Sequence, residues 1–557
     1  MRRIAHPPAA PTDASDAASS VTACATTSSG YPVTTTRRRL LQGAGALLLA
    51  PWVQVRAADA PVWQADPFAL GVASGDPAPD GFVLWTRLAP EPLEAERGNT
   101  GGMHGASVRI AYEIARDPGL HDIVQRGTAM AEAQWAWSVH LEVAGLEPAR
   151  DYWYRFTSGN ATSPVGRART APAASARVGR LRLAWVSCAN YEHGWYAAYR
   201  HLASETPDLV MFLGDYIYEG IDRSGHAVRQ HSEGRPAANL IGYRKRHAQY
   251  KLDPDLRALH AASTALMGWD DHEVQNNYAG AWSQGFVEPQ RFLARRAAAY
   301  RAFYEHMPLR ARSRPDGPNL VLYRRLRLGD LAEIALVDGR QYRSPPACQS
   351  PDTVRQFRLL TDGACPERRD PARSLLGTPQ EAWLHAGLAA SPTRWNLVAQ
   401  DVQMAQRKER SSDGATGWGN DNWDGYPAAR GRLLEHLRDA RVTNPLVLSG
   451  DIHSFCAADL KTNFDDPAAP PVATEFTVSS ISSTGPARNP GRTWHDDNPH
   501  VRFFEGTKRG YATMELDAAR ATVRYRAVAD ARDRASGVAT VASFTVESGR
   551  AGIASQS

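Results

Sequence analysis

The stretches MFLGDYIYEG (211–220) and LVLSGDIHSF (446–455) decide the fold, because in each an apolar run breaks at Gly-Asp. A short, continuous apolar run is typical of a strand that is buried on both faces of a sheet. Each break then presents polar side chains, Asp215 and Tyr218 in the first stretch and Asp451 and His453 in the second. Carboxylate, phenol and imidazole groups brought to one place indicate a metal centre for hard or borderline cations. Such a centre requires that the two strands end side by side.

The same form, an apolar run followed by a polar turn, recurs throughout the second part of the chain. It is found at 180–190, 207–215, 263–273, 330–340, 393–402 and 444–453. Helical patterns lie between these runs at 194–205, 288–307 and 377–391. Buried strands that alternate with helices predict an α/β domain with a largely parallel or mixed sheet. Ligand sites of such sheets lie beyond the carboxyl ends of the strands, which is where the polar residues of this chain gather.

Residues 61–175 have a different pattern, in which short alternating stretches lie between Pro/Gly turns. Strands are predicted over 81–88, 107–115, 137–146 and 151–159. This spacing is typical of a small β-sandwich of immunoglobulin or fibronectin type, and GLEPARDYWYRF (145–156) resembles its E–F corner, with Tyr152 or Tyr154 at the turn. We therefore expect three successive parts, a β-sandwich domain over 61–175, an α/β domain over 181–545 and a tail over 546–557.

The first 60 residues are interpreted as an extension followed by a targeting segment. TTTRRRLLQ (34–42) precedes the apolar GAGALLLAPW (43–52) and then small residues around Ala57, which together form a signal peptide. The run from Thr36 to Gln42 is similar to the twin-arginine export signal, and a general secretory signal that contains arginines is the alternative. We expect export by the twin-arginine machinery to the periplasm or the medium.

The charge balance excludes some classes of partner. The formal charge is +5, but the first 60 residues hold six arginines and three aspartates, so the rest of the chain is nearly neutral. No Lys/Arg-rich run occurs there, which argues against nucleic-acid binding. The apolar run of the signal is too short to span a bilayer, and no second run reaches that length. We expect a protein without a stable membrane anchor that acts as a monomer.

The five cysteines fall into different classes. Cys24 lies in the extension, and Cys456 follows the second deciding stretch as a buried core thiol. Cys348 and Cys365 flank a loop rich in Pro, Asp and Gly, at a separation that suits a disulfide in an exported protein. Cys188 ends a buried apolar run, where a passive thiol and a metal ligand are both possible interpretations.

Six groups of polar residues at strand ends form the candidate site. A single Asp at such a position is usually a helix cap or a turn residue, and a single His is usually a polar residue without a ligand. The recurrence of carboxylates, His, Tyr and Cys at successive strand ends favours a shared site instead. The groups are Ser187–Asn190, Asp215 with Tyr218, Asp270–Glu273 with Asn276 and Asn277, Asp338–Arg343, Gln400 with Asp401, and Asp451 with His453.

Several of these segments together resemble one known family. GDYIYEG (214–220), WDDHEVQNNY (269–278), VDGRQYR (337–343) and SGDIHS (449–454) follow SCANYEHGWYAAY (187–199) in the order typical of PhoD-type alkaline phosphatases. These belong to the calcineurin-like metallophosphoesterase superfamily. GVASGDP (71–77) and FVLWTRL (82–88) are similar to the opening β domain of that family, so the resemblance covers about residues 62–545. It implies a metallophosphoesterase-type two-sheet α/β sandwich after a small β-sandwich.

The resemblance also implies a metal complement of Fe(3+) and Ca(2+). Iron would be held by Cys188, Asp215, Tyr218 and His453, with Asp451 as a further ligand. Calcium would be held by oxygens of Asp215, of Asp270 or Asp271, of Asn277 and of Asp451. The residue types agree, because phenolate and thiolate favour trivalent iron and Asp and Asn oxygens favour calcium. Adjacent residues of an extended chain point in opposite directions, so the sequence does not decide between Asp270 and Asp271.

The expected reaction is hydrolysis of phosphate monoesters and diesters by a metal-activated hydroxide. Arg340 and Arg343 are candidates for binding the phosphate, with surface ion pairs as the alternative. Asn190, Tyr191 and His272 are further polar candidates. No Gly-x-Ser-x-Gly nucleophile motif, Walker A loop or dinucleotide fingerprint occurs. The alternatives are a phosphodiesterase or phospholipase D-like hydrolase of the same family, and an inactive cell-surface binding protein.

Overall fold

The computed structural model describes residues 61–94, 100–225, 227–352, 359–410 and 414–557. The targeting segment and Cys24 lie outside this range. Within it, the order of elements alternates strands and helices after residue 180, as the apolar runs predict. Among the described helices, none is both long and apolar enough to cross a membrane.

The larger of two facing sheets has ten strands, and its centre is parallel. β9, β10 and β11 run parallel to one another, and β1 joins them parallel to β11. The remaining strands flank this centre in antiparallel pairs. The order across the sheet is β24 (Ser555–Gln556), β23 (Val538–Glu547), β22 (Arg520–Val528), β21 (Arg509–Asp517), β9 (Arg180–Val186), β10 (Leu209–Phe212), β11 (Thr264–Met267), β1 (Val72–Ala78), β2 (Gly81–Arg87) and β5 (Ser138–Val143). β24 lies in the segment expected as a tail.

The second sheet has seven strands, four of which are parallel neighbours. β13, β14, β17 and β19 are paired in this way, so their carboxyl ends lie at one edge. The order is β12 (Arg324–Leu328), β13 (Ala332–Leu336), β14 (Trp395–Ala399), β17 (Pro445–Ser449), β19 (Pro471–Thr477), β18 (Phe455–Lys461) and β20 (Val501–Glu505).

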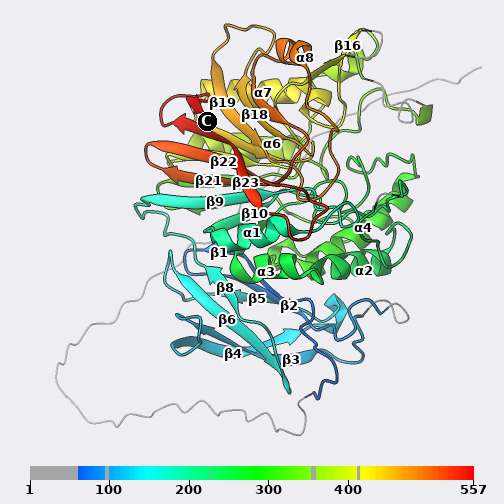
Figure 1. Cartoon of the computed structure of the whole chain (residues 1–557), viewed down its shortest axis with the longest axis vertical. Helices are drawn as coiled ribbons and strands as arrows, with labels where there is room; N and C mark the ends of the chain where they lie inside the picture. Colours follow the sequence, from blue (N-terminus) through cyan, green and yellow to red (C-terminus); the bar gives the residue numbers. More distant parts are fainter. Residues whose placement is uncertain (1–60, 95–99, 226, 353–358, 411–413) are drawn as a thin grey trace, which may run out of the picture. The chain divides into compact units, whose positions relative to one another are not determined.

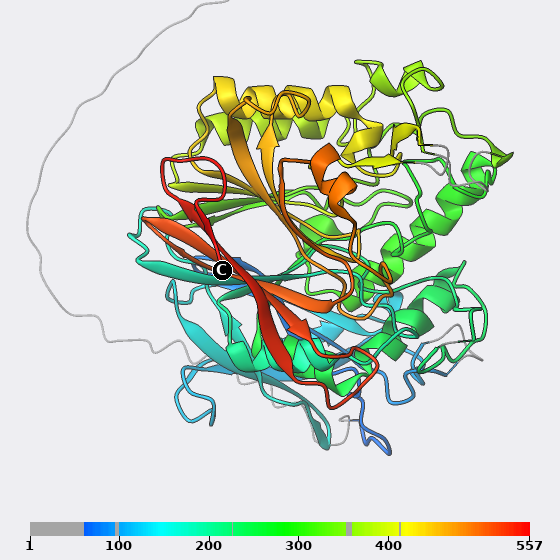
Figure 2. The same ribbon diagram turned by 45° about the horizontal axis from the view of Figure 1, so that its top comes forward.

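Three apolar cores hold four layers together. Side chains of both sheets, among them Trp185 of β9 and Phe455 of β18, form the central core. A second core lies between the ten-stranded sheet and α1 (Ala197–Glu205), α2 (Leu240–Lys251), α3 (Pro254–Ala262) and α4 (Pro289–His306). A third lies between the seven-stranded sheet and α6 (Thr378–Ala390) and α7 (Pro427–Asp439), which run along its outer face in Figure 2. The expected two-sheet α/β sandwich is confirmed (Figure 1).

The small β-sandwich is confirmed as well, but one of its two sheets is shared. Its five-stranded sheet consists of β4 (Ile123–Ala131), β3 (Val108–Ala115), β6 (Asp151–Ser158), β7 (Ala161–Thr162) and β8 (Gly166–Arg169). This sheet packs on β1, β2 and β5, which are the end of the ten-stranded sheet. The Tyr152 hydroxyl accepts a hydrogen bond from the backbone N–H of Glu147 at 2.9 Å, which identifies it as the tyrosine of the corner.

Candidate metal centre

The two deciding stretches meet at the edge where their strands end. The Tyr218 hydroxyl, in the turn after β10, lies 3.0 Å from Nε2 of His453, in the turn after β17. The turn after β9 joins them, because the N–H of Cys188 donates to the carbonyl of Gly214 and that of Ala189 donates to the carbonyl of Asp215. The site is therefore built from both sheets.

Three groups of side chains bring possible metal-binding atoms within 4.8 Å of one another. The groups are Cys188, Asp215 and His453, then Asp215, Asp271 and His272, and finally Asp270, Asp271 and Asp451. Asp215 belongs to the first two groups and Asp271 to the last two. The groups therefore form one continuous cluster, and Asp215 lies between its sulfur- and nitrogen-containing part and its carboxylate part.

The backbone of this cluster is unusual. Cys188, Asp215, Asn277, Asp451 and His453 all have φ between 51° and 68°, in the left-handed region. Residues other than glycine rarely adopt this region, and such strain gathers at functional sites where the surrounding structure enforces it. Here the left-handed turns point side chains from separate strand ends toward one point.

Burial makes the anionic forms of these groups unfavourable on their own. It raises the pKa of the Cys188 thiol, and the neighbouring Asp215 carboxylate raises it further. Burial also raises the pKa of the Tyr218 hydroxyl and of Asp215. The pKa of His453 falls to about 4 because of its burial, which keeps its imidazole neutral. A bound cation favours all four groups in the forms that ligate metals.

Arg340 lies beneath the cluster and has no exposed surface. Its guanidinium group donates to Asp270 and, at 2.8 Å, to Asp421, and it lies 3.5 Å from oxygens of Asp271 and Asp401. Asp451 is 3.9 Å away. The alternative of surface ion pairs is therefore wrong, because these pairs are buried. Arg340 contacts the carboxylates that surround the site.

Arg343 supports the same region from one side. It donates to the carbonyl of Asp421 at 2.8 Å and to its carboxylate at 3.2 Å, and its side chain is buried. Arg340 and Arg343 lie within 4 Å of the carboxylates of Asp270, Asp271, Asp401, Asp421 and Asp451, and Asp215 adds a sixth carboxylate to the same cluster. Among the described residues, both oxygens of Asp401 and Oδ2 of Asp270 also lack hydrogen-bond partners. This surplus of carboxylates over guanidinium groups fits bound cations.

The neighbouring Asp270 and Asp271 differ in their contacts. Asp270 is fully buried and paired with Arg340. Asp271 belongs to two of the three groups, and its Oδ2 accepts the N–H of Asn277 at 2.6 Å. The Arg340 charge and this hydrogen bond outweigh burial and keep the pKa of Asp271 below its usual range. Asn277 itself lines the hollow beside Asp451.

His272 and Asn190 take up different positions at the site. Nδ1 of His272 lies 2.6 Å from Oε2 of Glu219, and its ring stacks on Tyr218 at 4.1 Å. The side-chain oxygen of Asn190 accepts the N–H of Glu192 at 2.9 Å, so it serves the turn after β9. Tyr191 lies outside the cluster, where its ring faces Arg229.

Two contact residues were not predicted from the sequence, and a third was predicted only as part of a loop. Glu219 lies inside the GDYIYEG segment and could have been found there as a partner for a histidine. Asp421 belongs to the loop 405–430, whose polar and aromatic composition predicts either a contact with substrate or a surface loop anchored by Trp, and the structure places it against Arg340. Ser483 donates to the Tyr218 hydroxyl at 2.8 Å from a serine-rich segment that carries no motif.

A hollow of about 280 Å³ opens beside the cluster. It is lined by side chains that include Asn277, Trp282, Asn420, Asp421 and Asp451. A second hollow shares Arg407 and Ile452 with the first and extends toward Trp494 and Phe504. The cluster is therefore open on the side of the first hollow, and this opening continues into the second hollow.

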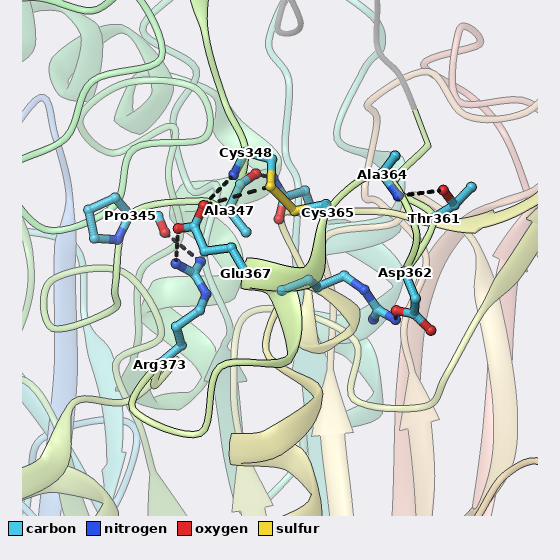
Figure 3. The surroundings of a disulfide bond; sticks show 11 residues. Pro345, Ala347, Cys348, Thr361, Asp362, Ala364, Cys365, Glu367 and Arg373 are labelled. Carbon is cyan, nitrogen blue, oxygen red and sulfur yellow. Dashed lines mark hydrogen bonds and ion pairs between the residues drawn. A yellow bond between two sulfur atoms is a disulfide. The ribbon is translucent and has the colours of Figure 1, made fainter.

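A disulfide braces one wall of the first hollow. Cys348 and Cys365 are bonded, and Figure 3 shows Glu367 between Cys348 and Arg373. Asn420 donates to the carbonyl of Ala347 at 2.8 Å, next to the disulfide. Cys188 and Cys456 are free and buried, as expected for Cys456.

Comparison with known proteins gives a consistent result over nearly the whole chain. Residues 183–525 match the PhoD-like phosphatase family, and residues 54–172 match the N-terminal domain of PhoD-like phosphatases. Alkaline phosphatase D of Bacillus subtilis (strain 168) is 40% identical over 541 residues, which are 93% of this chain and 89% of that protein. A solved structure of PhoD superposes with a TM-score of 0.82 at 40% identity, covering 89% of this chain and 94% of that one.

The resemblance found in the sequence is confirmed by these matches, and the fold agrees with it. The chain therefore belongs to the PhoD-like phosphatase family and is a hydrolase of phosphoric ester bonds.

Proposed function

We propose that this protein is an exported alkaline phosphatase that hydrolyses phosphate esters at a centre of iron and calcium. The observation that carries the proposal is the meeting of Cys188, Asp215 and His453 with Tyr218, next to a surplus of carboxylates. Thiolate, phenolate and imidazole form a donor set for trivalent iron, and the carboxylates with Asn277 form one for calcium.

Within this proposal, Asp215 is shared by the two metal sites. Cys188, Asp215, Tyr218 and His453 would hold iron, with Asp451 close to both sites. Asp271 is proposed over Asp270 as the calcium ligand, because Arg340 pairs with Asp270. When bound, the metal ions supply Lewis acidity toward phosphoryl oxygens and a hydroxide nucleophile at moderate pH.

The other side chains orient the cluster and its substrate. Arg340 donates hydrogen bonds to Asp270 and Asp421 and balances their negative charge. Its proposed role is therefore to hold these carboxylates in position. Glu219 accepts the Nδ1–H of His272, and Nε2 of His272 lies 4.0 Å from Oδ2 of Asp271, so it faces the cluster, where it can hold a proton for the departing alkoxide. Ser483 donates to the Tyr218 oxygen and favours its anionic form.

The test is metal analysis of the purified mature protein, combined with its visible spectrum and its turnover of a nitrophenyl phosphate. Phenolate or thiolate bound to Fe(III) gives a charge-transfer band, which we expect to disappear in Tyr218→Phe. Tyr216→Phe is the matched control, because Tyr216 lies in the same turn but bonds His260. An active protein without iron and without this band would overturn the iron assignment but leave hydrolysis intact.

A phosphodiester substrate is the second candidate. The continuation of the first hollow into the second through Arg407 and Ile452 favours it, because the open side has room for a second substituent on the phosphate. Turnover of a bis-nitrophenyl diester against a nitrophenyl monoester separates the two. A kcat/KM at least as high for the diester would support this candidate.

Export by the twin-arginine route is part of the proposal. It is supported by the Arg37–Arg39 run, followed by a short apolar segment. Fusing residues 1–60 to a reporter that fluoresces only when it is exported in folded form tests this route. Export that continues after Arg37 and Arg38 are replaced by Lys would favour the general secretory route.

A further inference from the structure

Two buried glutamates lie behind the metal centre, one in each half, and neither belongs to the three metal-binding groups. Glu273 is 1% exposed and Glu475 is 0% exposed. Their carboxylate oxygens contact the chain backbone near the candidate ligands. This distinguishes them from the carboxylates that face the site.

Glu273 joins the turns after β10 and β11. One oxygen, Oε2, accepts the N–H of Asp215 at 3.0 Å and that of Asp270 at 2.7 Å. The other, Oε1, accepts the N–H of Tyr216 at 2.6 Å and that of Ile217 at 3.3 Å. A single side chain therefore binds the backbone on both sides of the first half of the cluster.

Glu475, on β19, does the same for the turns after β14 and β17. Its Oε1 accepts the N–H of Met404 at 2.7 Å and the hydroxyl of Ser449 at 2.7 Å, and its Oε2 accepts the N–H of Ala405 at 2.6 Å. Ser449 stands two residues before Asp451. The N–H of Gly450 also donates to the carbonyl of Asp401 at 2.8 Å, which links the two turns directly.

Glu273 bonds a strained turn directly, through the N–H of Asp215, and Glu475 reaches the strained turn of Asp451 through the hydroxyl of Ser449. Asp215 has a φ of 51° and Asp451 a φ of 68°, conformations that persist only when neighbouring contacts enforce them. Hydrogen bonds from N–H groups to a carboxylate are stronger than those to a neutral acceptor. In addition, a carboxylate accepts hydrogen bonds at both of its oxygens. The amide of a glutamine would place an NH₂ donor against the backbone N–H groups on one side.

We propose that Glu273 and Glu475 are positioning residues, each of which holds the left-handed turn that carries one half of the metal centre. The inference rests on the proposed function in one respect, because it takes Asp215 and Asp451 as metal ligands. It adds to that function two residues that contact neither metal nor substrate. Their conservative replacement is expected to weaken metal binding through the backbone.

The variants are Glu273→Gln and Glu475→Gln, and the control is Asp459→Asn. Asp459 is also a buried carboxylate that accepts a backbone N–H, that of Ile553 at 2.9 Å, but its strand, β18, places it away from the cluster. Two measurements are made on the full mature chain. They are calorimetric titration of the metal-free protein with Ca²⁺, and amide hydrogen exchange of the turns without metal.

We expect both Gln variants to bind Ca²⁺ about 10- to 100-fold more weakly, the range found for outer residues that orient ligands. Glu273→Gln should have the larger effect, because each oxygen of Glu273 accepts two N–H groups whereas each oxygen of Glu475 accepts one. Amide hydrogen exchange should be faster at residues 215–217 and 270 in Glu273→Gln, and at residues 404–405 in Glu475→Gln. Asp459→Asn should leave both measurements at wild-type values.

Wild-type affinity and wild-type exchange in both Gln variants would overturn the inference. If the wild-type chain binds no metal, the proposed function fails, while the exchange rates still decide whether the glutamates hold the turns. Should a Gln variant not fold, Glu273→Asp and Ser449→Ala take its place. The first keeps the charge with a shorter reach, and the second removes only the hydroxyl that donates to Glu475.

Discussion

Arg340 and Asp270 form an ion pair in which neither side chain has any exposed surface. Opposite charges buried together in this way stabilise the folded state little by themselves, but removal of one partner leaves the other charged and unpaired. The pair lies directly behind Asp271 and Asp401. Its integrity therefore affects both the stability of the protein and the arrangement of the carboxylates.

Arg340→Met tests whether this arginine supports the site or binds substrate. We expect the free energy of unfolding to fall by about 3–5 kcal/mol, because the Asp270 carboxylate loses its partner. Urea denaturation of the metal-free protein measures this change. A variant with wild-type stability and only a raised KM would show instead that Arg340 contacts the phosphate of the substrate.

Exchange of the two adjacent aspartates for asparagine should separate their roles. Asp271→Asn is expected to raise the dissociation constant for Ca²⁺ at least about tenfold, because it removes a charged ligand that belongs to two of the three groups. Asp270→Asn should mainly lower the free energy of unfolding, since it breaks the pair with Arg340. Calorimetric titration with Ca²⁺ and urea denaturation are measured on both variants. If Asp270→Asn weakens Ca²⁺ binding and Asp271→Asn lowers the stability instead, Asp270 is the calcium ligand.

Lys251 should make the protein more stable as the pH rises. Its ammonium group is buried over the Trp85 ring at 4.2 Å, near His247 and His260, and no carboxylate in the described part of the chain pairs with it. Burial lowers its pKa from 10.5 to about 7. Between these values the unfolded chain binds a proton that the folded chain does not, so stability falls as the pH drops from 10.5 to 7. The slope is about 1.4 kcal/mol per pH unit.

Lys251→Met removes this proton. Its free energy of unfolding should exceed that of the wild type most at pH 7, and the difference should shrink as the pH approaches 10. Urea denaturation at a series of pH values measures both curves. Parallel curves would mean that the Lys251 side chain is solvated in the folded protein and has no such effect.

Gly339 should not tolerate a side chain. A β-carbon there would lie 2.3 Å from Oδ1 of Asp401, so Gly339→Ala must displace that carboxylate. We expect a loss of about 1–3 kcal/mol of stability, together with reduced turnover. Gly431→Ala is the control, since nothing lies within 4 Å of a β-carbon at this position of α7, and it should be neutral or stabilising by up to about 1 kcal/mol. Equal thermal stability and turnover in the two variants would contradict the expected clash.

The strands and helices of the α/β part could be predicted because their apolar runs are long and continuous. The run before Asp451 became β17, and the helical pattern at 288–307 became α4. β4 was missed because most of its side chains are exposed or only partly buried, so its apolar signal is weak. Burial on both faces leaves a clear pattern in a sequence, and the partial burial of an edge strand such as β4 does not.

The site could be predicted as a set of residues but not as an arrangement. The strand-end pattern identified Asp215, Tyr218 and His453, because parallel strands bring their ends to one edge. The contacts of Arg340, and those of Glu273 and Glu475, depend on pairings between distant segments, which local patterns do not encode. For the same reason the sequence does not show which of Asp270 and Asp271 is the ligand, because they differ only in their contacts within the fold.

The small sandwich and the larger fold share one sheet, and this constrains the order in which parts of the chain can fold during synthesis. β1 pairs with β11, so Ser74 has its sheet partner in Thr264, and the ribosome must complete the intervening segment before the first strand can dock. Pairings over such sequence separations form slowly. The first strand of the small sandwich therefore cannot finish folding as it emerges, and both sheets of the sandwich are complete only after β11 has been made.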